Sequence, residues 1–558
     1  MISGEMLDEK TRGLKLYMTV SGLSTVVHLA SWLVTSAILS GASAVSATAV
    51  AWLAGGTFAR NVNFYVWFGL FFVSGFAMCV LAMLVASVAS KSRAGYTLAF
   101  TFLLASFVFQ VIMTNPNSIN GMYRDQPVLT PLRKAFEWYP GFLFVKVFAD
   151  FAFHSGTFFN FQRFRYVAGG PMPDSALFEP YLKPTGFGFF EIPGPIDSFW
   201  LVIRDMAAYL ILIVFFELAL PSNQGAFKNP LQPLKALLRK LVFSGREESE
   251  LVWALNALSP APGTHESVQD QIKDVNFLSK EISSGPKNCL IVKGISKNYG
   301  RLCGKKTQAV QNVNFCVQEG EVLTVLGKNG AGKTTLINLI TGYLQPCEGD
   351  VYTFGHFLST DINALRKLTS LCPQNDIHWE NLTVREHLDL FALIKGISDR
   401  EKRRLEVSRL LSLVSLQEKE DSRVKTLSGG MQRRLAIAIA CIGDPRVLIF
   451  DEPTTGLDPI RKHEVLELIK QLKSNKIVLL TTHSMEEADE LSDRVLVMKD
   501  GKVVVLGTAK ALKEEFSQGY TLSIILKDCS SVEKVTQSLK ELKLGFSIDS
   551  IFDKRIDL

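Results

Sequence analysis

The stretch that decides the fold is Gly327-Lys328-Asn329-Gly330-Ala331-Gly332-Lys333-Thr334-Thr335, which has the spacing G-x-x-x-x-G-K-[ST]. The apolar run Glu321–Leu326 predicts a buried strand before it, and Leu336–Thr341 predicts a helix after it. Glycines at such a junction let backbone N–H groups close around phosphates at the helix N-terminus. Lys333 is expected to reach the β- and γ-phosphates, and Thr334 to hold Mg²⁺ through its hydroxyl.

A second stretch, Val447-Leu448-Ile449-Phe450-Asp451-Glu452, places two carboxylates at the end of an apolar run that predicts a strand. Asp451 is expected to support Mg²⁺, and Glu452 to polarise the attacking water. On its own, such a run is often only a strand that leaves a core. Its position downstream of a phosphate-binding loop favours the catalytic interpretation.

The motif Leu427-Ser428-Gly429-Gly430-Met431-Gln432 resembles the signature of ATP-binding cassette (ABC) proteins. The family's other motifs appear in its order: an adenine-stacking aromatic (Tyr299), a Q-loop (Gln374), a D-loop (Asp458) and a switch histidine (His483). Each residue alone has a plainer interpretation, such as a core tyrosine, a solvated glutamine or a hydrogen-bonded structural histidine. The ordered set, which covers about 289–511, favours the cassette.

The resemblance implies a role for each matched residue. The catalytic residues are Lys333, Gln374, Glu452 and His483. The ATP contacts are Tyr299, Gly327, Asn329, Gly330, Ala331, Gly332, Lys333, Thr334, Thr335, Ser428, Gly429, Gly430 and Asp458, and the Mg²⁺ ligands are Thr334, Gln374 and Asp451. In the family, each ATP lies between the phosphate-binding loop of one cassette and the signature of another. The resemblance therefore implies a partner, either a second copy of this chain or the other half of a full transporter.

Residues 23–220 predict a membrane domain. Hydrophobic residues make up 47% of the chain, whose mean hydropathy is +0.18, and they concentrate before residue 220. Because a spanning helix needs about 20 apolar residues, we expect four spans, at 23–39, 64–89, 96–114 and 199–220. Basic residues before the first span and between the second and third place those segments inside. The N-terminus and the cassette of this multi-pass membrane protein are therefore both expected to be cytosolic.

The segment 115–198 is then expected outside, and its part 136–164 is rich in aromatic residues. Lys146 and Asp150 would make a full span costly there. We expect a partly inserted, re-entrant helix pair that is buried against protein, with a fifth true span as the alternative.

The other boundaries follow from composition. Residues 1–22 predict an amphipathic helix at the membrane surface, 221–288 a cytosolic linker, 289–515 the cassette and 516–558 a short tail with strands and a helix. The predicted fold class is a membrane α-helical domain plus an α/β P-loop NTPase domain, with a short α+β tail.

Several details resemble subfamily A of the ABC transporters, which moves lipids. They are Arg433-Arg434-Leu435 after the signature, Asn375-Asp376 after the Q-loop, and 9–23, which is similar to that subfamily's cytosolic coupling helix. The tail is similar to the start of its regulatory domain. The resemblance implies two spans and a large exterior domain before Met1, so we expect a fragment or a reduced form. The expected function is ATP-driven movement of a lipid. The alternatives are export of another hydrophobic molecule and a non-transporting, ATP-binding regulatory subunit.

Charge and cysteine content argue against other classes. The net charge of +6 is not gathered into a basic stripe, so nucleic acid is not an expected partner. The 8 cysteines have no C-x-x-C spacing, and all but one lie in the part expected in the cytosol. We therefore expect no disulfide and no structural metal. The first 16 residues are charged and lack an apolar core, which does not fit a signal peptide.

Overall fold

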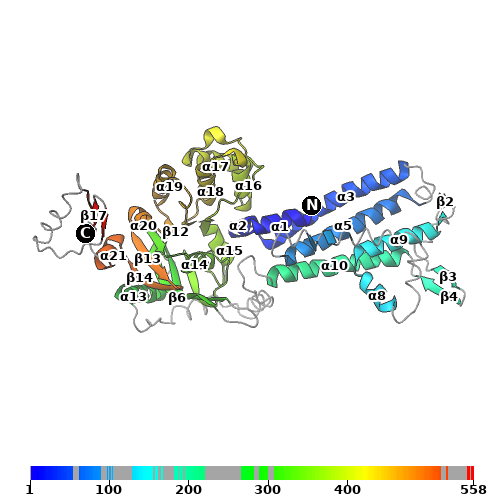
Figure 1. Ribbon diagram of the computed structural model, residues 1–558, viewed down its shortest axis with the longest axis horizontal. Coiled ribbons are helices and arrows are strands. Elements are labelled where there is room, and N and C mark those ends of the chain that lie inside the picture. Colours follow the sequence, from blue (N-terminus) through cyan, green and yellow to red (C-terminus); the bar gives the residue numbers. More distant parts are fainter. Residues whose placement is uncertain are drawn as a thin grey trace, which may run out of the picture.

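The computed structural model places a bundle of long helices at one end and the cassette beside it (Figure 1). The described residues are 2–53, 62–89, 97–98, 100–101, 104, 129–154, 158–160, 165–167, 181–185, 188–192, 195–219, 265–281, 288–299, 307–516, 523–525, 550–552 and 555–557. No disulfide joins the cysteines within these ranges, which are Cys79, Cys289, Cys316, Cys347, Cys372 and Cys441.

The cassette is built on a mainly parallel sheet with the strand order β10-β11-β12-β7-β13-β14. Its strands are β7 (Val322–Leu326), β10 (Thr369–Cys372), β11 (Val447–Asp451), β12 (Ile477–Thr482), β13 (Arg494–Lys499) and the antiparallel β14 (Lys502–Gly507). Along β11, Val447 and Ile449 face one hydrophobic core while Leu448 and Phe450 face another, so both sides of the sheet are covered. Because parallel strands end at one edge, the loops after β7, β10, β11 and β12 meet there.

A second sheet, antiparallel and ordered β6-β5-β8-β9, packs beside the first. Its strands are β5 (Cys289–Tyr299), β6 (Thr307–Gln318), β8 (Glu348–Thr353) and β9 (His356–Phe357). Helix α13 (Glu266–Glu281) covers its other face, where Val275 is fully buried beside Ile291 and Tyr352. This helix lies inside 221–288, which the sequence predicted to be a linker. The prediction is wrong for α13, because its apolar positions complete the cassette.

Seven further helices carry or support the motifs. They are α14 (Lys333–Ile340), α15 (Ile362–Leu368), α16 (Val384–Ile394), α17 (Arg400–Leu413), α18 (Gly429–Ala440), α19 (Pro459–Leu472) and α20 (Met485–Leu491), and α21 (Ala509–Phe516) follows them. Helices α16, α17 and α18 form a lobe around Leu388, Leu410 and Leu435 (Figure 1). A reciprocal capping box between Thr383 and Glu386 fixes the start of α16.

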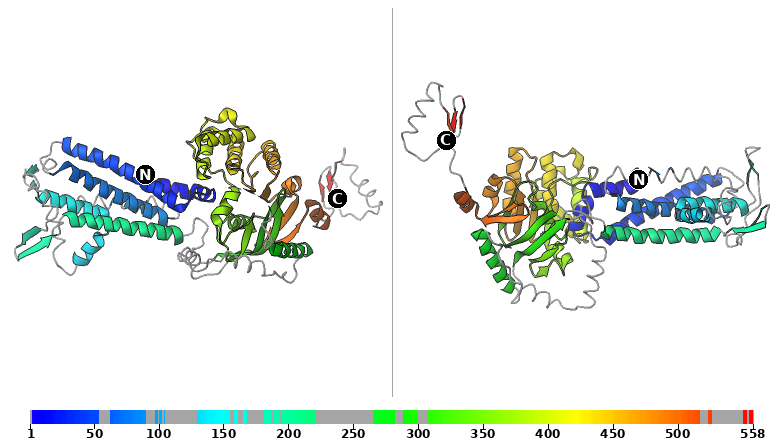
Figure 2. Two further views of the ribbon diagram at one scale, coloured as in Figure 1. Left: turned by 180° about the vertical axis from the view of Figure 1, so that it is seen from behind. Right: turned by 60° about the horizontal axis from the view of Figure 1, so that its bottom comes forward.

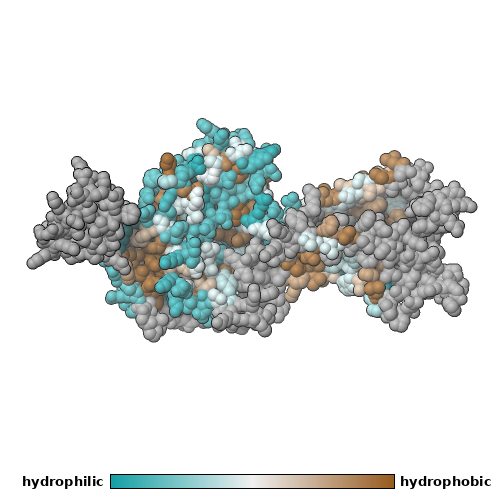
Figure 3. All heavy atoms as spheres, in the orientation of Figure 1, coloured by the Kyte–Doolittle hydropathy of each residue, from teal (hydrophilic) through white to brown (hydrophobic). Residues whose placement is uncertain are grey.

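Three long apolar helices, α3 (Thr25–Leu53), α5 (Phe64–Val88) and α10 (Pro195–Ala219), lie side by side (Figure 2). In the described part of the chain these three are long and apolar enough to cross a membrane. Figure 3 shows the contrast between their apolar surface and the hydrophilic cassette. Helix α3 runs well beyond the predicted end at residue 39, because small apolar residues continue the helical sequence. Most of the predicted span at 96–114 lies outside the described residues.

Helices α8 (Leu129–Phe136) and α9 (Pro140–His154) form a helix pair, and α9 packs against α5 and α10. The 15 residues of α9 extend about 22 Å, less than the roughly 30 Å of a hydrocarbon core. This length disfavours a fifth full span and suits the re-entrant pair, which stays a prediction. Two short antiparallel ladders follow: β1 (Phe158–Asn160) with β2 (Arg165–Val167), and β3 (Tyr181–Thr185) with β4 (Gly188–Ile192).

The tail contains an antiparallel sheet of β15 (Ser523–Ile525), β17 (Arg555–Asp557) and β16 (Ser550–Phe552). The helix predicted between its strands lies outside the described residues.

The N-terminal segment forms two helices, α1 (Ile2–Thr11) and α2 (Leu14–Val20), which are separated at Gly13 with φ +80°. Helix α1 packs against α5, and α2 enters the cassette core with Tyr17 and Met18. The predicted single helix is therefore divided in two at Gly13, and the apolar side chains of α2 pack against protein. The position of this segment at the membrane surface stays a prediction.

Candidate functional site

The loop between β7 and α14 has a backbone that only glycine adopts without strain at two positions. Gly330 and Gly332 have φ values of +84° and +103°. A Cβ atom on Gly332 would lie 2.5 Å from the carbonyl oxygen of Ala309. Lys333 begins α14, and its Nζ donates to the carbonyl oxygens of Gly327 at 2.7 Å and Lys328 at 3.4 Å. The loop thus holds a cation over the helix N-terminus, where phosphate oxygens bind favourably.

Asp451 ends β11 among hydroxyl groups. Thr481 Oγ1 donates to Asp451 Oδ1 at 2.6 Å, and the hydroxyl of Thr334 also hydrogen-bonds this carboxylate. Burial raises the pKa of Asp451 and the charge of Glu452 adds to the rise, while the hydroxyls and Lys333 oppose it. A divalent cation would supply the charge that favours the ionised carboxylate. Thr334 and Asp451 offer the oxygen ligands that Mg²⁺ prefers, so these residues fit the predicted metal.

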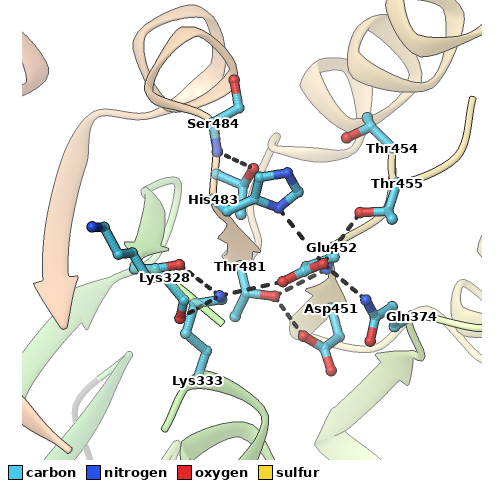
Figure 4. Close-up of polar contacts among 12 residues, drawn as sticks. Lys328, Lys333, Gln374, Asp451, Glu452, Thr454, Thr455, Thr481, His483 and Ser484 are labelled. Carbon is cyan, nitrogen blue, oxygen red and sulfur yellow. Dashed lines mark hydrogen bonds and ion pairs between the residues drawn. The ribbon is translucent and has the colours of Figure 1, made fainter. Parts of the chain in front are cut away.

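Glu452 follows β11 and gathers the other motif residues around one carboxylate (Figure 4). Its Oε2 accepts hydrogen bonds from Gln374 Nε2 at 2.8 Å and Thr455 Oγ1 at 3.2 Å. Lys333 Nζ lies 3.3 Å from Oε1, and His483 Nδ1 lies 3.7 Å from Oε2. The structure therefore brings together all four residues that the sequence predicted to be catalytic. A carboxylate held over the loop in this way has the position of a general base.

The backbone of Glu452 adopts φ +43°, which is uncommon for a residue with a Cβ atom. Its N–H group is held by the carbonyl oxygen of Thr481 at 3.2 Å and by Thr481 Oγ1 at 3.0 Å. Such a conformation costs on the order of 1–3 kcal/mol and occurs where the surroundings fix it, often at functional sites. The strained turn fixes the direction in which the carboxylate leaves the sheet edge.

The signature and D-loop residues are engaged in a different set of contacts. Ser428 caps α18 by accepting from the N–H of Met431 at 3.4 Å, and Asp458 caps α19. A Cβ atom on Gly430 would lie 2.7 Å from Cδ of Arg461, whose Nε pairs with Asp458 at 3.2 Å. The two caps are thus joined through one arginine. Contact of these residues with a nucleotide on another cassette stays a prediction.

Tyr299 ends β5 and packs, partly buried, against the core between the two sheets. Its hydroxyl hydrogen-bonds Thr335, which places the ring beside the phosphate-binding loop. Of the other predicted contacts in this loop, Asn329 is exposed and Ala331 is buried. Stacking of Tyr299 on adenine stays a prediction.

Two further residues, Arg433 and Glu487, belong to the site, although the sequence motifs do not predict a function for either. Arg433 is buried, and its guanidinium donates to the carbonyl oxygen of Pro453 at 2.7 Å and pairs with Asp376 at 3.0 Å. It thereby ties the signature helix to the Q-loop and to the turn after Glu452. In the sequence, the paired arginines after the signature indicate only a family resemblance.

Glu487 is the second. It accepts hydrogen bonds from Thr454 at 2.6 Å and Thr482 at 2.5 Å and pairs with Lys462 at 2.9 Å. It locks the turn after β11 to the end of β12, which carries His483. No local pattern distinguishes it from its surface neighbour Glu486, so only the fold reveals it.

Helices α1 and α2 connect the site to the long helices. Lys10 Nζ donates to the carbonyl oxygens of Ser87 and Ala89 at 2.9 Å each, and so caps the C-terminal end of α5. On α2, the Tyr17 ring lies 5.0 Å from the Phe391 ring, and Lys15 forms an ion pair with Glu217 at the end of α10. A helix seated in the cassette is therefore bound directly to a long apolar helix.

The Tyr17 hydroxyl is buried beside the Arg433–Asp376 pair and has no hydrogen-bond partner among the described residues. Burial raises its pKa well above the usual value. Tyr17 of α2 therefore lies beside Arg433, which holds the turn after Glu452.

The chain matches two family models. The ABC-2 family transporter protein model covers residues 1–220, and the ABC transporter model covers residues 310–455. ABC transporter A family member 1 of Dictyostelium discoideum is 29% identical over 95% of this chain and 58% of its own length. Phospholipid-transporting ATPase ABCA3 of Homo sapiens is 40% identical over 44% of this chain and 14% of its own length.

A third relative, the ABC-type organic anion transporter ABCA8B of Mus musculus, is 30% identical over 86% of this chain and 27% of its own length. The chain spans less than two thirds of the length of each of these relatives. The cassette motifs, the long apolar helices and both family matches agree. The chain belongs to the ABC transporters, joins an ABC-2 family membrane domain to one ABC cassette, and has relatives in subfamily A.

Proposed function

We propose that this chain hydrolyses ATP and couples the hydrolysis to movement of a lipid across or out of a membrane. The observation that carries hydrolysis is the Glu452 carboxylate, 3.3 Å from Lys333 and hydrogen-bonded by Gln374. This geometry supports a base that orients water, next to a lysine for the phosphate oxygens. A regulatory subunit that only bound ATP would not need this arrangement.

Thr334, Asp451 and Gln374 would hold Mg²⁺, which neutralises phosphate charge when it is bound. The amide nitrogen of Gln374 is already directed to Glu452, so its carbonyl oxygen is the atom left to face a metal. His483 would contact the γ-phosphate, since it lies on the far side of Glu452 from the Asp451 carboxylate (Figure 4).

A second cassette would complete each site. Ser428, Gly429, Gly430 and Asp458 would contact the nucleotide held by the phosphate-binding loop of the partner. The partner is a second copy of this chain or the other half of a full transporter. The shared Arg461 contact would let the signature and D-loop respond together when the cassettes close.

The lipid cargo rests on the relatives in subfamily A, one of which is named as a phospholipid-transporting ATPase. Closure of the cassettes would move α2, and the Lys15–Glu217 pair would pass that motion to α10. We place the N-terminus and the cassette in the cytosol, where ATP is available.

The test is transport by the reconstituted chain. Liposomes carry a fluorescent phosphatidylcholine, and an external quencher reports how fast the dye changes leaflet. We expect faster exchange with MgATP than with a non-hydrolysable ATP analogue. Equal rates with the two nucleotides would contradict the proposal.

A second candidate is an organic anion as cargo, because one relative is named as an organic anion transporter. To distinguish the two candidate cargos, a fluorescent organic anion without acyl chains is trapped in the same liposomes. ATP-dependent loss of the anion without movement of the lipid would favour this candidate. ATP binding without movement of either would favour a regulatory subunit.

A further inference from the structure

Helix α10 carries a charged pair, Arg204 and Asp205, in the middle of the candidate span Pro195–Glu217, while its other charged residues, Asp197 and Glu217, lie near the two ends. Arg204 is nine residues from the start of this helix, which corresponds to a depth of about 14 Å. Charged groups at such depth are costly and are kept where they have a function or a partner.

The Arg204 guanidinium is held from three directions. Its Nε and Nη2 donate to Asp205 Oδ1 at 3.0 and 2.8 Å. Nη2 also donates to the carbonyl oxygen of Glu137 at 3.1 Å, and the Trp138 ring lies 4.2 Å below the guanidinium carbon. These contacts fix the plane of the guanidinium group.

The partners of Arg204 come from the turn between α8 and α9, which is itself anchored to α10. The hydroxyl of Tyr209 donates to the carbonyl oxygen of Trp138. Asp205 is fully buried, whereas Arg204 is 39% and Trp138 49% exposed. The carboxylate is therefore enclosed, and the guanidinium and the indole form the outer surface of the cluster.

One side of the guanidinium remains open. Nη1 of Arg204 has no hydrogen-bond partner within the described ranges, although Nε and Nη2 are both used. Lys146 and Asp150 on the neighbouring α9 are fully buried and paired, so they offer nothing at this surface.

We propose that Arg204 and Trp138 bind the phosphate of a phospholipid headgroup at this depth in the membrane domain. The proposal rests on the lipid cargo proposed above and assigns a position to its headgroup. A rigid, planar donor suits phosphate oxygens, and the charge-assisted hydrogen bond gains strength where water is excluded. The indole face beside it accommodates the apolar glycerol and the first part of the acyl chains.

The test is binding without nucleotide, with purified full-length chain in a phosphate-free detergent. Titrations use a short-chain phosphatidylcholine, the diacylglycerol with the same acyl chains, and inorganic phosphate. We expect the phosphatidylcholine to bind at least about tenfold tighter than the diacylglycerol. Arg204→Gln should remove that preference, and Lys134→Gln, which changes an exposed cation on α8, should keep it.

Three results would overturn the proposal. They are wild type without preference for the phosphatidylcholine, Arg204→Gln with an undiminished preference, and inorganic phosphate that binds as tightly as the lipid. The last result would indicate a free-phosphate site.

A measurement on wild type covers the case in which Arg204→Gln does not fold. A phosphatidylcholine with a photoreactive headgroup should crosslink to peptides containing Trp138 or Arg204. Crosslinks confined to other peptides would overturn the proposal. These binding experiments contain no nucleotide, so a negative result would not affect the proposal of ATP hydrolysis. Conversely, Glu452→Gln should lose ATP hydrolysis and still bind the headgroup as wild type does.

Discussion

A lysine–carboxylate pair is buried in each domain, and the two pairs differ in how they meet solvent. Lys333 and Glu452 in the cassette are 5% and 10% exposed and come from separate loops of the sheet edge. Lys146 and Asp150 in the membrane domain are both 0% exposed and lie one turn apart on α9. The first pair shares its groups with Gln374, Thr455 and loop carbonyls, whereas the second is on a helix whose Phe142 and Phe151 belong to buried apolar clusters.

The difference indicates different roles for the same chemistry. A pair with additional partners and some exposure can exchange those partners for a substrate. A fully buried pair is closed to a substrate, and removal of one member leaves the opposite charge of the other buried. We therefore expect loss of activity when the cassette lysine is replaced and loss of stability when the membrane-domain lysine is replaced.

The largest expected effect is on the enclosed pair. Lys146→Met leaves the Asp150 carboxylate buried without its cation, which should cost about 3–5 kcal/mol of unfolding free energy. The double variant Lys146→Met/Asp150→Leu should regain most of it, because an apolar pair of similar volume needs no charge balance. Thermal unfolding in detergent measures both. A single variant as stable as wild type would break the comparison.

The cassette pair should respond in the opposite way. Lys333→Met should lower the rate of ATP hydrolysis on the order of 100- to 1000-fold, because a fixed cation at the phosphates is lost. Its unfolding midpoint should stay near that of wild type, since Gln374 and Thr455 still donate to Glu452. Hydrolysis and melting are measured on one preparation. A large loss of stability would assign Lys333 the same role as Lys146.

Acid should weaken the cassette through two buried histidines. Burial lowers the pKa of His378 and of His387 to about 4. His378 Nε2 bonds the carbonyl oxygen of Gln432, and its Nδ1 is buried without a partner in the described part of the chain. His387 Nε2 accepts from the N–H of Trp379 at 2.9 Å, which only an unprotonated nitrogen can do.

In the unfolded chain both histidines bind protons near pH 6.5, whereas in the folded chain they do so only near pH 4. The free energy of unfolding therefore decreases as the pH falls from about 6.5 toward 4. We expect a loss of roughly 2 kcal/mol for each of the two histidines between pH 7.5 and pH 5. Denaturant unfolding of wild type and of His387→Gln measures it, and the variant should show a shallower slope. If the unfolding free energy of wild type and of His387→Gln depended equally on pH, His387 would not contribute to the loss of stability in acid.

The smallest effect concerns the contact between the domains. Lys15 and Glu217 are partly exposed, so their pairing should contribute about 0.5–1 kcal/mol. A double-mutant cycle with Lys15→Met and Glu217→Gln isolates this term, and Arg12→Gln, which removes the exposed pair with Glu380, is the matched control. A coupling energy of zero would mean that α2 and α10 touch without an energetic link.

The sequence predicted the site better than the surroundings of the site. Lys333, Asp451, Glu452 and His483 were predictable because their chemistry demands fixed residue types at strand ends. Arg433 and Glu487 were not, since their roles depend on which distant carbonyls and hydroxyls the fold brings to them. The same holds for α13 and α2, whose apolar positions say that a partner exists but not which one. Arg204 lies in a predicted span, and the apolar pattern of a span does not reveal which groups contact each face of the helix.

The most direct measurement is the hydrolysis of radiolabelled ATP by the purified chain, wild type beside Glu452→Gln. Glutamine keeps the size of the side chain and removes the base. The variant should bind ATP with the affinity of wild type while its turnover falls at least about 100-fold. Turnover at the wild-type rate would contradict the assignment of Glu452 and the proposal that this carboxylate drives the transporter.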